Sequence, residues 1–391
     1  MDPSSGGPCQ GIRNSIPELQ KLGIENLVVC LDDPDVPFLG KDPFPIIALG
    51  PARTSWAYSS LLLPWLLENL PNFDAVIVHG LWQYHGYAVA KAHHRLKNNN
   101  SGFQVNMFVM PHGMLDPYFQ HAPGRKLKAL RNIAYWKLIE KKIVNNADGL
   151  FFTCQKELEL ARQPFQPYHP KRELNIGYGI VPPPLFEVKM KKAFAEKCPE
   201  LGDQPYLLFL SRIHEKKGLD LLIHALAQLV DKNKFQDVSM LPVLVIAGPG
   251  MDSPYGKKIL QSVLENKELS KRIYFPGMLD GDAKWGAFYG CEAFILPSHQ
   301  ENFGIAVAEA LACSKPVLIS DQVNICLEIG EAGAGVVEKD TEAGCLNLLI
   351  TWLNLTIANK EEMAINAEQC YKKHFSIAPN AIRMKKALGG V

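Results

Sequence analysis

The sequence predicts two α/β domains, each built on a doubly wound parallel sheet. Short apolar runs alternate with helical patterns along most of the 391 residues, which is the order of elements that such sheets require. A chain of this length holds two domains of ordinary size. The glycine and proline cluster Gly177–Pro184 interrupts the alternation near the middle of the chain and indicates a linker.

The first domain begins with a glycine-containing loop instead of a strand. This loop covers Ser4 to Gly11, and a helix is expected over about residues 12–22. The first strand is expected only at Leu27–Leu31, so no strand is expected ahead of the loop. The later strands of this domain are expected at Ala75–His79, from Phe108 onward, and at Leu150–Thr153.

The second domain is expected to begin with the strand Tyr206–Leu210, followed by a helix from Leu219 to Val230. Its last helical region, Glu361–Leu388, is broken at Phe375–Pro379. Further strands are expected at Val243–Ala247, at about residues 272–275, and at Ala293–Leu296, Val317–Ile319 and Gly335–Val337.

Composition narrows the class of protein. Hydrophobic residues make up 47% and charged residues 21%, and the net charge is +1. These values are typical of a water-soluble globular protein and give no general attraction to nucleic acid. Nine cysteines are scattered without any Cys-x-x-Cys pair, which favours reduced thiols in the cytoplasm over a zinc site or a disulfide framework. The sequence shows no signal peptide and no membrane-spanning run.

The most informative stretch runs from Phe294 to Val317. A buried strand at Ala293–Leu296 stops at a polar loop that ends in Gly304, and a helix follows from Ile305 to Ala312. A loop of this kind is rich in backbone N–H groups and is pointed at by the start of a helix. It therefore suits a phosphate group.

Two carboxylates mark the same stretch, Glu301 in the loop and Glu309 in the helix, with seven residues between them. Glu309 has apolar neighbours, so we expect it to be partly buried and to need a partner. In one interpretation, Glu301 is simply a charged loop residue, and Glu309 pairs with a structural Arg or a backbone group. The other is binding to sugar hydroxyls, which donate hydrogen bonds to carboxylates.

A basic turn follows the strand Tyr206–Leu210. Arg212 and Lys217 precede Gly218 at a strand-to-helix turn. Arg212 can bind a phosphate bidentately and Lys217 acts as a point charge. A basic loop alone is more often simply solvated, but the acidic motif on the same expected sheet edge favours a diphosphate clamp.

Two histidines stand at the ends of strands in the first domain, His79 and His112. Ligands of open α/β sheets collect at the carboxyl ends of strands. The alternative is that either histidine is structural or merely exposed.

The segment Arg125–Lys142 interleaves basic residues with leucine, isoleucine and aromatic residues. A helix of this composition can lie in the interface of an anionic membrane. The alternative is an ordinary surface helix whose apolar face belongs to the core.

Two Asp-x-Asp sequences resemble metal-binding motifs, Asp33-Pro-Asp35 and Asp280-Gly-Asp282. The first is a loop interrupted by proline, and Asp282 is expected to be the N-cap of the next helix. We therefore expect no metal site.

The stretch from Glu301 to Val317 resembles the Glu-x7-Glu signature of the retaining family 4 glycosyltransferases with the GT-B fold. In that family two Rossmann-like domains face each other across a cleft. The resemblance implies an acceptor-binding domain over residues 1–180, completed by a C-terminal helix at about residues 376–391. It implies a nucleotide-sugar-binding domain over residues 181–375.

The resemblance also implies the roles of individual residues. Glu301 would hold donor-sugar hydroxyls and Glu309 the ribose, and Arg212 and Lys217 would hold the donor phosphates. The segment Pro111–Asp116 is similar to the Pro-His-Gly segment of polysaccharide-assembly members, which would place His112, with His79, on the acceptor side near the reacting sugar. The remaining expected contacts to the donor are Gly6, Gly7, Gly248, Met278, Asn302, Phe303, Gly304 and Ile305.

The expected activity is transfer of a hexose from a nucleotide sugar, with UDP as the carrier, to a glycan or lipid-linked acceptor. His112, Glu301, Arg212 and Lys217 would be the catalytic residues, and no metal or cofactor would be needed. The expected location is the cytoplasm, at the inner face of the cell membrane if the basic helix binds lipid. A sugar-nucleotide epimerase of the same fold and a non-catalytic binding protein are the alternatives.

Overall fold

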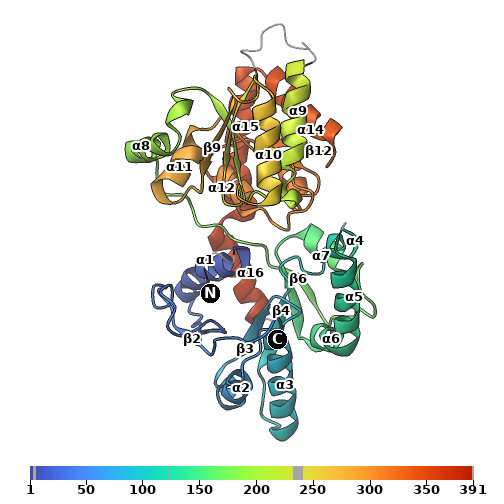
Figure 1. Ribbon diagram of the computed structural model, residues 1–391. Helices are drawn as coiled ribbons and strands as arrows, with labels where there is room; N and C mark the ends of the chain where they lie inside the picture. The colour runs from blue at the N-terminus through green and yellow to red at the C-terminus, as the bar shows by residue number, and fades with distance from the viewer. Residues whose placement is uncertain (3–5, 123, 232–240, 390–391) are drawn as a thin grey trace. The chain divides into compact units, whose positions relative to one another are not determined.

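The computed structural model describes residues 1, 2, 6–122, 124–231 and 241–389, and the chain forms two compact units (Figure 1). Unit 1 comprises Met1–Gly179 and Ile377–Val391, and unit 2 comprises Ile180–Ser376. The expected division, at 180/181 and 375/376, lies one residue away at each crossing. Each unit is an α/β structure with parallel strands, as the sequence predicts.

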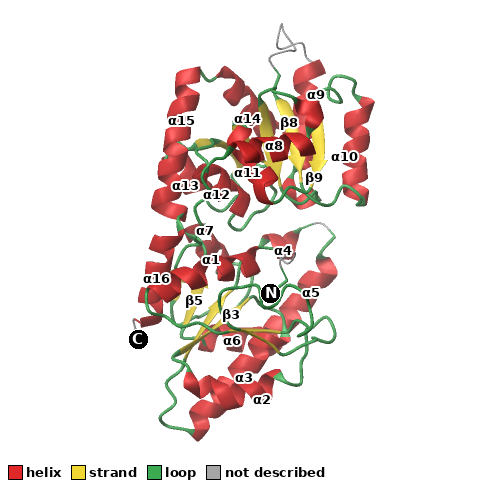
Figure 2. Cartoon of the chain, turned by 90° about the vertical axis from the view of Figure 1, so that its left-hand side faces the viewer, coloured by secondary structure: helices red, strands yellow, loops and turns green. Residues whose placement is uncertain are grey.

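Unit 2 contains a six-stranded parallel sheet in the order β12-β11-β10-β7-β8-β9, with helices on both faces (Figure 2). The first strand of the unit, β7, lies at the centre, and the chain winds outward to one edge before it returns beside β7 as β10. The strands are β7 (Tyr206–Leu210), β8 (Val243–Ala247), β9 (Ile273–Gly277), β10 (Ala293–Leu296), β11 (Val317–Ser320) and β12 (Gly335–Glu338).

The central strands of unit 2 are almost entirely apolar because helices cover both faces of the sheet. All residues of β8, β10 and β11 are buried. The helices of this unit are α8 (Val188–Lys197), α9 (Leu219–Asp231), α10 (Pro254–Glu265), α11 (Gly281–Gly290), α12 (Ile305–Ala312), α13 (Cys326–Glu331), α14 (Glu342–Asn354) and α15 (Ile357–Cys370).

Unit 1 divides its strands between two sheets. A four-stranded parallel sheet has the order β3-β4-β5-β6, and β1 and β2 form a separate parallel pair. The strands are β1 (Val28–Cys30), β2 (Ile46–Ala48), β3 (Ala75–His79), β4 (Asn106–Met110), β5 (Gly149–Phe152) and β6 (Glu173–Asn175). As expected, the first strand follows the first helix: the described residues ahead of that helix, residues 1, 2 and 6, form none.

The helices of unit 1 are α1 (Gly7–Lys21), α2 (Leu62–Asn69), α3 (Tyr84–Asn99), α4 (Tyr118–His121), α5 (Lys126–Tyr135), α6 (Lys141–Asn146), α7 (Gln155–Ala161) and α16 (Ile377–Gly389). The sequence placed the first helix about five residues too late. It begins at Gly7 because Pro8 fits the first helical turn, where a backbone N–H has no partner within the helix.

Asp282 is not the N-cap of α11, as the sequence had suggested. The helix begins at Gly281, so Asp280 occupies the N-cap position and Asp282 lies in the first turn. Its carboxylate approaches the ammonium of Lys189 at 3.9 Å. An acidic residue in the first turn complements the helix dipole.

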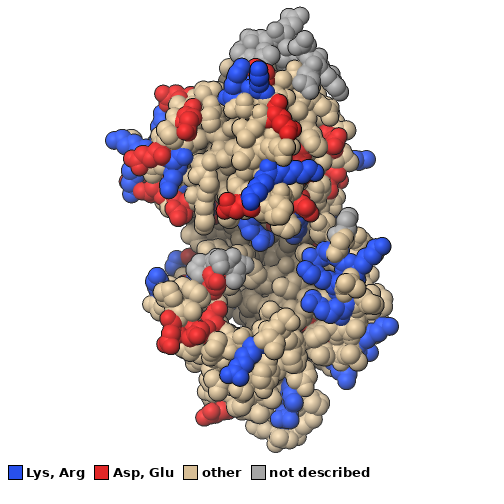
Figure 3. Space-filling view, viewed as in Figure 1, with Lys and Arg blue, Asp and Glu red and all other residues tan. Residues whose placement is uncertain are grey.

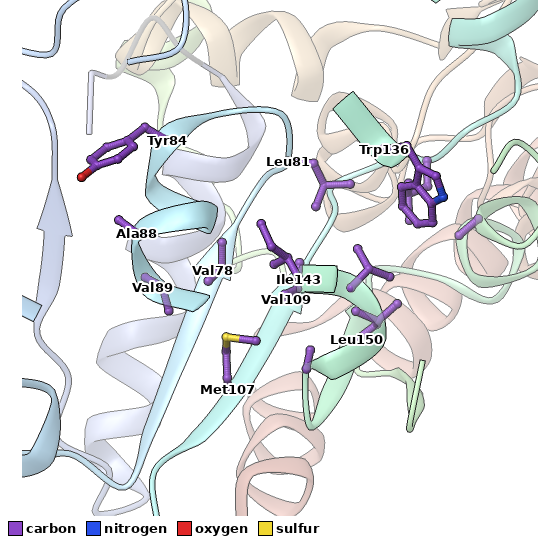
Figure 4. Close-up of a cluster of buried hydrophobic side chains, with 14 of the residues drawn as sticks. Val78, Leu81, Tyr84, Ala88, Val89, Met107, Val109, Trp136, Ile143 and Leu150 are labelled. Atoms are coloured by element: carbon purple, nitrogen blue, oxygen red, sulfur yellow. The ribbon is translucent and has the colours of Figure 1, made fainter. Parts of the chain in front are cut away.

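The core of unit 1 lies where α3 and the segment Trp136–Val144 cover the four-stranded sheet. Figure 4 shows Val78, Val109 and Leu150 from three adjacent strands in one buried cluster with Trp136. Trp136 is fully buried and stacks on Phe165, with ring centroids 5.0 Å apart. Close packing of this kind fixes the orientation of the helix that carries Trp136.

The helix that carries Trp136 contains a π-helical turn, Trp136–Glu140, between α5 and α6. Its buried side consists of Ala129, Asn132, Trp136 and Glu140. The leucines of the segment instead face outward: Leu127 is 85%, Leu130 65% and Leu138 74% exposed. The interpretation in which the apolar face of this helix belongs to the core therefore holds for Trp136 and Ile139, which pack into it, and fails for the three leucines.

Glu140 is a buried carboxylic acid, only 1% exposed. The backbone N–H of Trp82 donates to its carboxyl group, but Oε2 has no hydrogen-bond partner among the described residues. Burial raises the pKa of Glu140 to about 8, and the hydrogen bond from Trp82 offsets only part of that effect. Glu140 is accordingly neutral at pH 7.

We predict that Glu140→Gln stabilises the protein at neutral and alkaline pH. The folded-state pKa lies above the unfolded value, so the stability that Glu140 contributes is present at low pH and is lost as pH rises from about 4.5 to 8. The amide keeps the shape without ionising. At pH 7.5 thermal unfolding should show a gain of about 1–3 kcal/mol that shrinks towards pH 5. A variant less stable than the parent at both pH values contradicts this assignment.

Candidate functional site

Two loops of unit 2 follow the neighbouring central strands β7 and β10. The first loop carries Arg212 and Lys217, and the second runs from Pro297 to Gly304. Because β7 and β10 are adjacent and parallel, the two loops leave the same edge of the sheet. The direction of winding reverses between these strands, and such a switch point is where open α/β sheets bind ligands.

The backbones of the two loops are locked together. The carbonyl oxygen of Lys216 accepts hydrogen bonds from the backbone N–H of His299 at 2.9 Å and from the Ser298 hydroxyl at 3.1 Å. Gly218 has a φ of +65°, and a Cβ atom there would lie 1.9 Å from the carbonyl oxygen of Pro297. Only glycine permits this approach.

Lys217 and Glu301 form an ion pair across the two loops. The backbone of Glu301 is fixed as well. Its N–H donates to the backbone carbonyl of Gln322 at 3.0 Å, and its own carbonyl accepts from the N–H of Asn324 at 3.0 Å. Burial alone would raise the pKa of Glu301, but the charges of Lys217, Lys216 and Arg212 hold that pKa below its usual value. Glu301 is therefore a carboxylate that accepts hydrogen bonds.

The loop after β10 ends at the N-terminus of α12. Gly304 is the N-cap residue and adopts a left-handed conformation, with a φ of +81°. A Cβ atom on Gly304 would lie 3.1 Å from Val307 and 3.3 Å from Glu301. Phe303 is buried, Ile305 begins the helix, and the Oδ1 atom of Asn302 lies 3.5 Å from Nδ2 of Asn324.

Glu309 is mostly buried in α12, as its apolar neighbours predict. Its carboxylate pairs with the ammonium of Lys284 at 2.6 Å, and that ammonium lies 4.5 Å from the ring of Trp285. Burial raises the pKa of Glu309, and the charge of Lys284 offsets part of the increase. The partner is thus a lysine from α11 instead of the arginine or backbone group that the sequence suggested.

Gly248 follows β8, and Met278 follows the edge strand β9. Gly248 has a φ of +141°, and a Cβ atom there would lie 1.9 Å from the carbonyl oxygen of Ser211. Gly248 therefore touches the start of the loop that carries Arg212. Met278 follows β9, the edge strand of the sheet, and its side chain is 64% exposed.

The remaining candidates lie in unit 1. Gly6 and Gly7 form the start of α1, and the hydroxyl of Tyr178 donates to the carbonyl of Gly7. His79 ends β3 and His112 follows β4, and their rings are stacked, with Nδ1 of His79 3.0 Å from Nε2 of His112. The structure thus brings His79 and His112 together within unit 1, and Arg212, Lys217 and Glu301 together within unit 2.

Both histidines are held neutral. Burial lowers the pKa of His79 to about 4, with a smaller effect from His85. Burial also lowers the pKa of His112 well below its usual value, and His79 adds to that effect. Neutral imidazole presents one N–H donor and one acceptor nitrogen.

Sequence reasoning missed Lys284, Glu157 and the pair His299–Asp340, whose atoms Nδ1 and Oδ1 lie 2.7 Å apart. Lys284 has no spacing signal, because its partner is 25 residues away. Glu157 stands three residues after the N-cap residue Cys154, where the Glu of a capping box lies, and that spacing could have singled it out.

Among the described residues, no group of three or more His, Cys, Asp or Glu side chains could hold a metal ion. No helix within the described ranges has the length and apolar character that crossing a membrane requires.

Models of known protein families match both units of the chain. The family model of the group 1 glycosyl transferases matches residues 190–369, and that of the glycosyl transferase 4-like domain matches residues 6–175. The chain belongs to the family 4 glycosyltransferases of group 1. The two matches fall on the two units, so both halves of this family member share the family pattern.

Three known proteins illustrate the range of its relatives. D-inositol 3-phosphate glycosyltransferase of Frankia alni is 31% identical over 138 residues, which are 34% of this chain and 33% of the relative. O-antigen chain mannosyltransferase C of Escherichia coli is 28% identical over 148 residues, 37% and 31% of the two chains. The structure of Anabaena Alr3699/HepE in complex with UDP and glucose matches with a TM-score of 0.71 at 16% identity. The match covers 99% of this chain and 96% of the Anabaena chain.

The matches to curated relatives span between 31% and 54% of the relatives' lengths. The similarity to solved structures extends over nearly the whole chain and identifies the GT-B fold. This group 1 glycosyltransferase therefore shares its fold with those structures.

We predict that Gly218→Ala destabilises unit 2 by about 2–4 kcal/mol, because the new methyl group meets the Pro297 carbonyl and the left-handed backbone is strained. Gly202→Ala is the matched control: Gly202 has a φ of +59° but open space around it. It should cost only about 1 kcal/mol. Chemical denaturation measures both, and equal losses would show that the contact with Pro297 is unimportant.

Proposed function

We propose that this protein transfers a hexose from a nucleotide sugar, with UDP as the leaving group, to a hydroxyl of a glycan or lipid-linked acceptor. We further propose that the anomeric configuration is retained. The ion pair between Lys217 and Glu301 carries the proposal. It places a cation that can bind phosphate beside a carboxylate that can bind sugar hydroxyls, at the switch point of the sheet. Membership of the family and the UDP and glucose bound to the Anabaena protein support it.

The departing diphosphate is the group that needs most stabilisation. Lys217 has three N–H donors, so its bond to Glu301 leaves donors for phosphate oxygens. Arg212 lies close enough to affect the pKa of Glu301 and is exposed. Together with the N–H groups at the start of α12, these cations oppose the negative charge that develops on the leaving group. We propose that they make a metal ion unnecessary.

The sugar and the ribose need hydrogen-bond acceptors. Glu301 remains ionised beside its cations and would accept from hydroxyls of the donor sugar, with Asn302, Phe303, Gly304 and Ile305 around it. Glu309 would bind the ribose, with Lys284 holding the carboxylate in place. Gly248 and Met278, at the ends of β8 and β9, would border the nucleobase.

The acceptor proton needs a destination. In the proposed reaction the acceptor oxygen bonds to the anomeric carbon as the bond from that carbon to the diphosphate oxygen breaks. The departing phosphate takes the acceptor's proton, so no covalent nucleophile is required. Gly6 and Gly7 would contact the donor, and His79 and His112 would lie on the acceptor side, where they orient the reacting groups.

We predict that UDP and UDP-hexoses raise the melting temperature of the protein, because a ligand that binds only the folded state stabilises it. Lys217→Ala should abolish the shift with UDP. Glu301→Ala should keep a shift with UDP but lose the additional shift with UDP-hexose, and both variants should lose transfer by at least about 100-fold. Thermal-shift assays and product analysis by NMR, which also reports the anomer, provide the measurements.

Lys271→Ala and Glu268→Ala are matched controls, since that ion pair in the same unit is exposed. Both should behave like the parent protein. Full transfer activity in Lys217→Ala or Glu301→Ala contradicts the proposed site. Conversion of a UDP-hexose to its epimer without acceptor would indicate the epimerase, and binding without any turnover would indicate a non-catalytic protein.

We also propose that the segment Lys126–Lys142 binds an anionic membrane. Exposed leucines at 127, 130 and 138 form an apolar stripe opposite the buried side of the helix. Exposed cations flank the stripe: Lys126, Lys128, Arg131, Lys137 and Lys142. Figure 3 shows Lys and Arg side chains gathered where Figure 1 draws α5. Leucines that enter the headgroup region and cations that stay at its surface fit anionic lipid.

A membrane-bound position would bring the protein to a lipid-linked acceptor at the inner face of the cell membrane. All nine cysteines are free thiols, which fits a reducing compartment. The proposed location is therefore the cytoplasmic surface of the membrane.

We predict that the protein sediments with vesicles containing phosphatidylglycerol and far less with neutral phosphatidylcholine vesicles. Replacing Leu127, Leu130 and Leu138 together by serine should reduce binding at least about 10-fold, because each leucine loses a favourable transfer into the interface. High salt should weaken binding by the parent. The control is Leu264→Ser, which changes a leucine in unit 2 that is 64% exposed. Equal binding by the triple variant and the parent contradicts the proposal.

A further inference from the structure

The two histidines of unit 1 form a hydrogen-bonded pair. The proposed reaction places both on the acceptor side but gives neither a specific task. The atoms Nδ1 of His79 and Nε2 of His112 are 3.0 Å apart. A hydrogen bond between two ring nitrogens contains one proton. If His79 donates, the remaining proton of His112 must sit on its Nδ1; if His112 donates, its Nδ1 is a bare acceptor.

The pair borders a pocket that lies entirely within unit 1. Besides the two histidines, Ser15, Met110, Tyr178 and Asn380 belong to its walls. None of the described residues lining the pocket is Asp, Glu, Lys or Arg. A pocket without charge suits an uncharged hydroxyl group, and hydroxyl groups need one acceptor and one donor.

His85 is the other titratable residue next to the pair. Its Nε2 lies 3.0 Å from the backbone carbonyl of His79, so Nε2 must carry the proton that it donates. His85 therefore fixes the backbone at the end of β3 and is not a proton acceptor for His79. The state of the pair is decided by His79 and His112 themselves.

The turn that carries His112 is built to hold the ring in place. His112 has a φ of +53°, and Gly113 follows with a φ of +76°. A left-handed histidine is strained and persists only where its surroundings hold it. The buried carboxylate of Glu157 does so: Oε1 accepts from the N–H of Gly113, and Oε2 accepts from the N–H and hydroxyl of Thr153.

We propose that His79 is a positioning residue for His112: its hydrogen bond decides which nitrogen of His112 carries the proton, so that the pair presents one donor and one acceptor to a substrate hydroxyl in the pocket. Glu157 supports this by fixing the turn that carries His112. The inference rests on the proposed function for the identity of the substrate, but the coupling of the two rings is a property of the free protein.

The coupling is tested first without substrate. In protein labelled with 15N-histidine, ring NMR spectra between pH 6 and 8 should show both rings neutral and in fixed tautomers, with the two outer nitrogens in opposite states. In His79→Phe, the signals of His112 should move to the averaged positions of an unconstrained imidazole. Unchanged tautomer signals for His112 in His79→Phe would overturn the proposal, whether or not the protein transfers sugar.

The kinetic test uses the same variants. With a UDP-hexose donor, His79→Phe should lower kcat about 10- to 100-fold with less than about a threefold change in donor KM. His79→Asn places an amide near the position of Nδ1 and should recover part of kcat. His94→Phe is the control, because His94 is an exposed histidine on α3. Parental kcat in a folded His79→Phe would overturn the positioning role.

The two failures are distinguishable. If the parent protein neither binds nor turns over any nucleotide sugar, the proposed function is wrong while the NMR result still decides the coupling. If the parent transfers sugar and His79→Phe does so equally well, the proposed function stands and the role of His79 falls.

Discussion

The contact between Gly218 and the Pro297 carbonyl is the constraint on which the site of unit 2 depends. It brings the loop after β7 against the loop after β10, and the carbonyl of Lys216 then accepts two hydrogen bonds from the second loop. Once these backbones are joined, the side chains of Lys217 and Glu301 lie next to each other and form an ion pair. The ion pair is a result of the fold at the switch point, and the fold needs glycine at one position to reach it.

The same geometry explains how a carboxylate is kept ionised in a buried place. Removing Glu301 from water favours its neutral form, and three nearby cations reverse that preference. Glu309 shows the opposite balance, because it has one cation and its pKa is raised. Two acidic residues eight positions apart therefore have different electrostatic surroundings, set by the number of cations around each.

Sequence reasoning identified much of the fold because the signals were local. The strand Ala293–Leu296 and the helix Ile305–Ala312 have the observed boundaries, and a strand, a glycine-containing loop and a helix form a pattern that needs no distant partner. The proximity of Lys217 and Glu301 could also be predicted, because their loops follow parallel strands and so leave the same edge of one sheet. Lys284 could not be found in this way, since it meets its partner across the fold, whereas the spacing of Glu157 from the N-cap residue Cys154 was a local signal.

The orientation of the basic helix was undecided for a related reason. Leucines mixed with lysines fit both a helix that faces inward and one that faces a membrane, and only the neighbours choose between them. Here Trp136 and Glu140 occupy the inward side and leave the leucines outside. Such a stripe has a practical consequence during purification: with no lipid to cover it, molecules will adhere to one another through it at high concentration. Mild detergent or a lipid nanodisc should keep the preparation monodisperse.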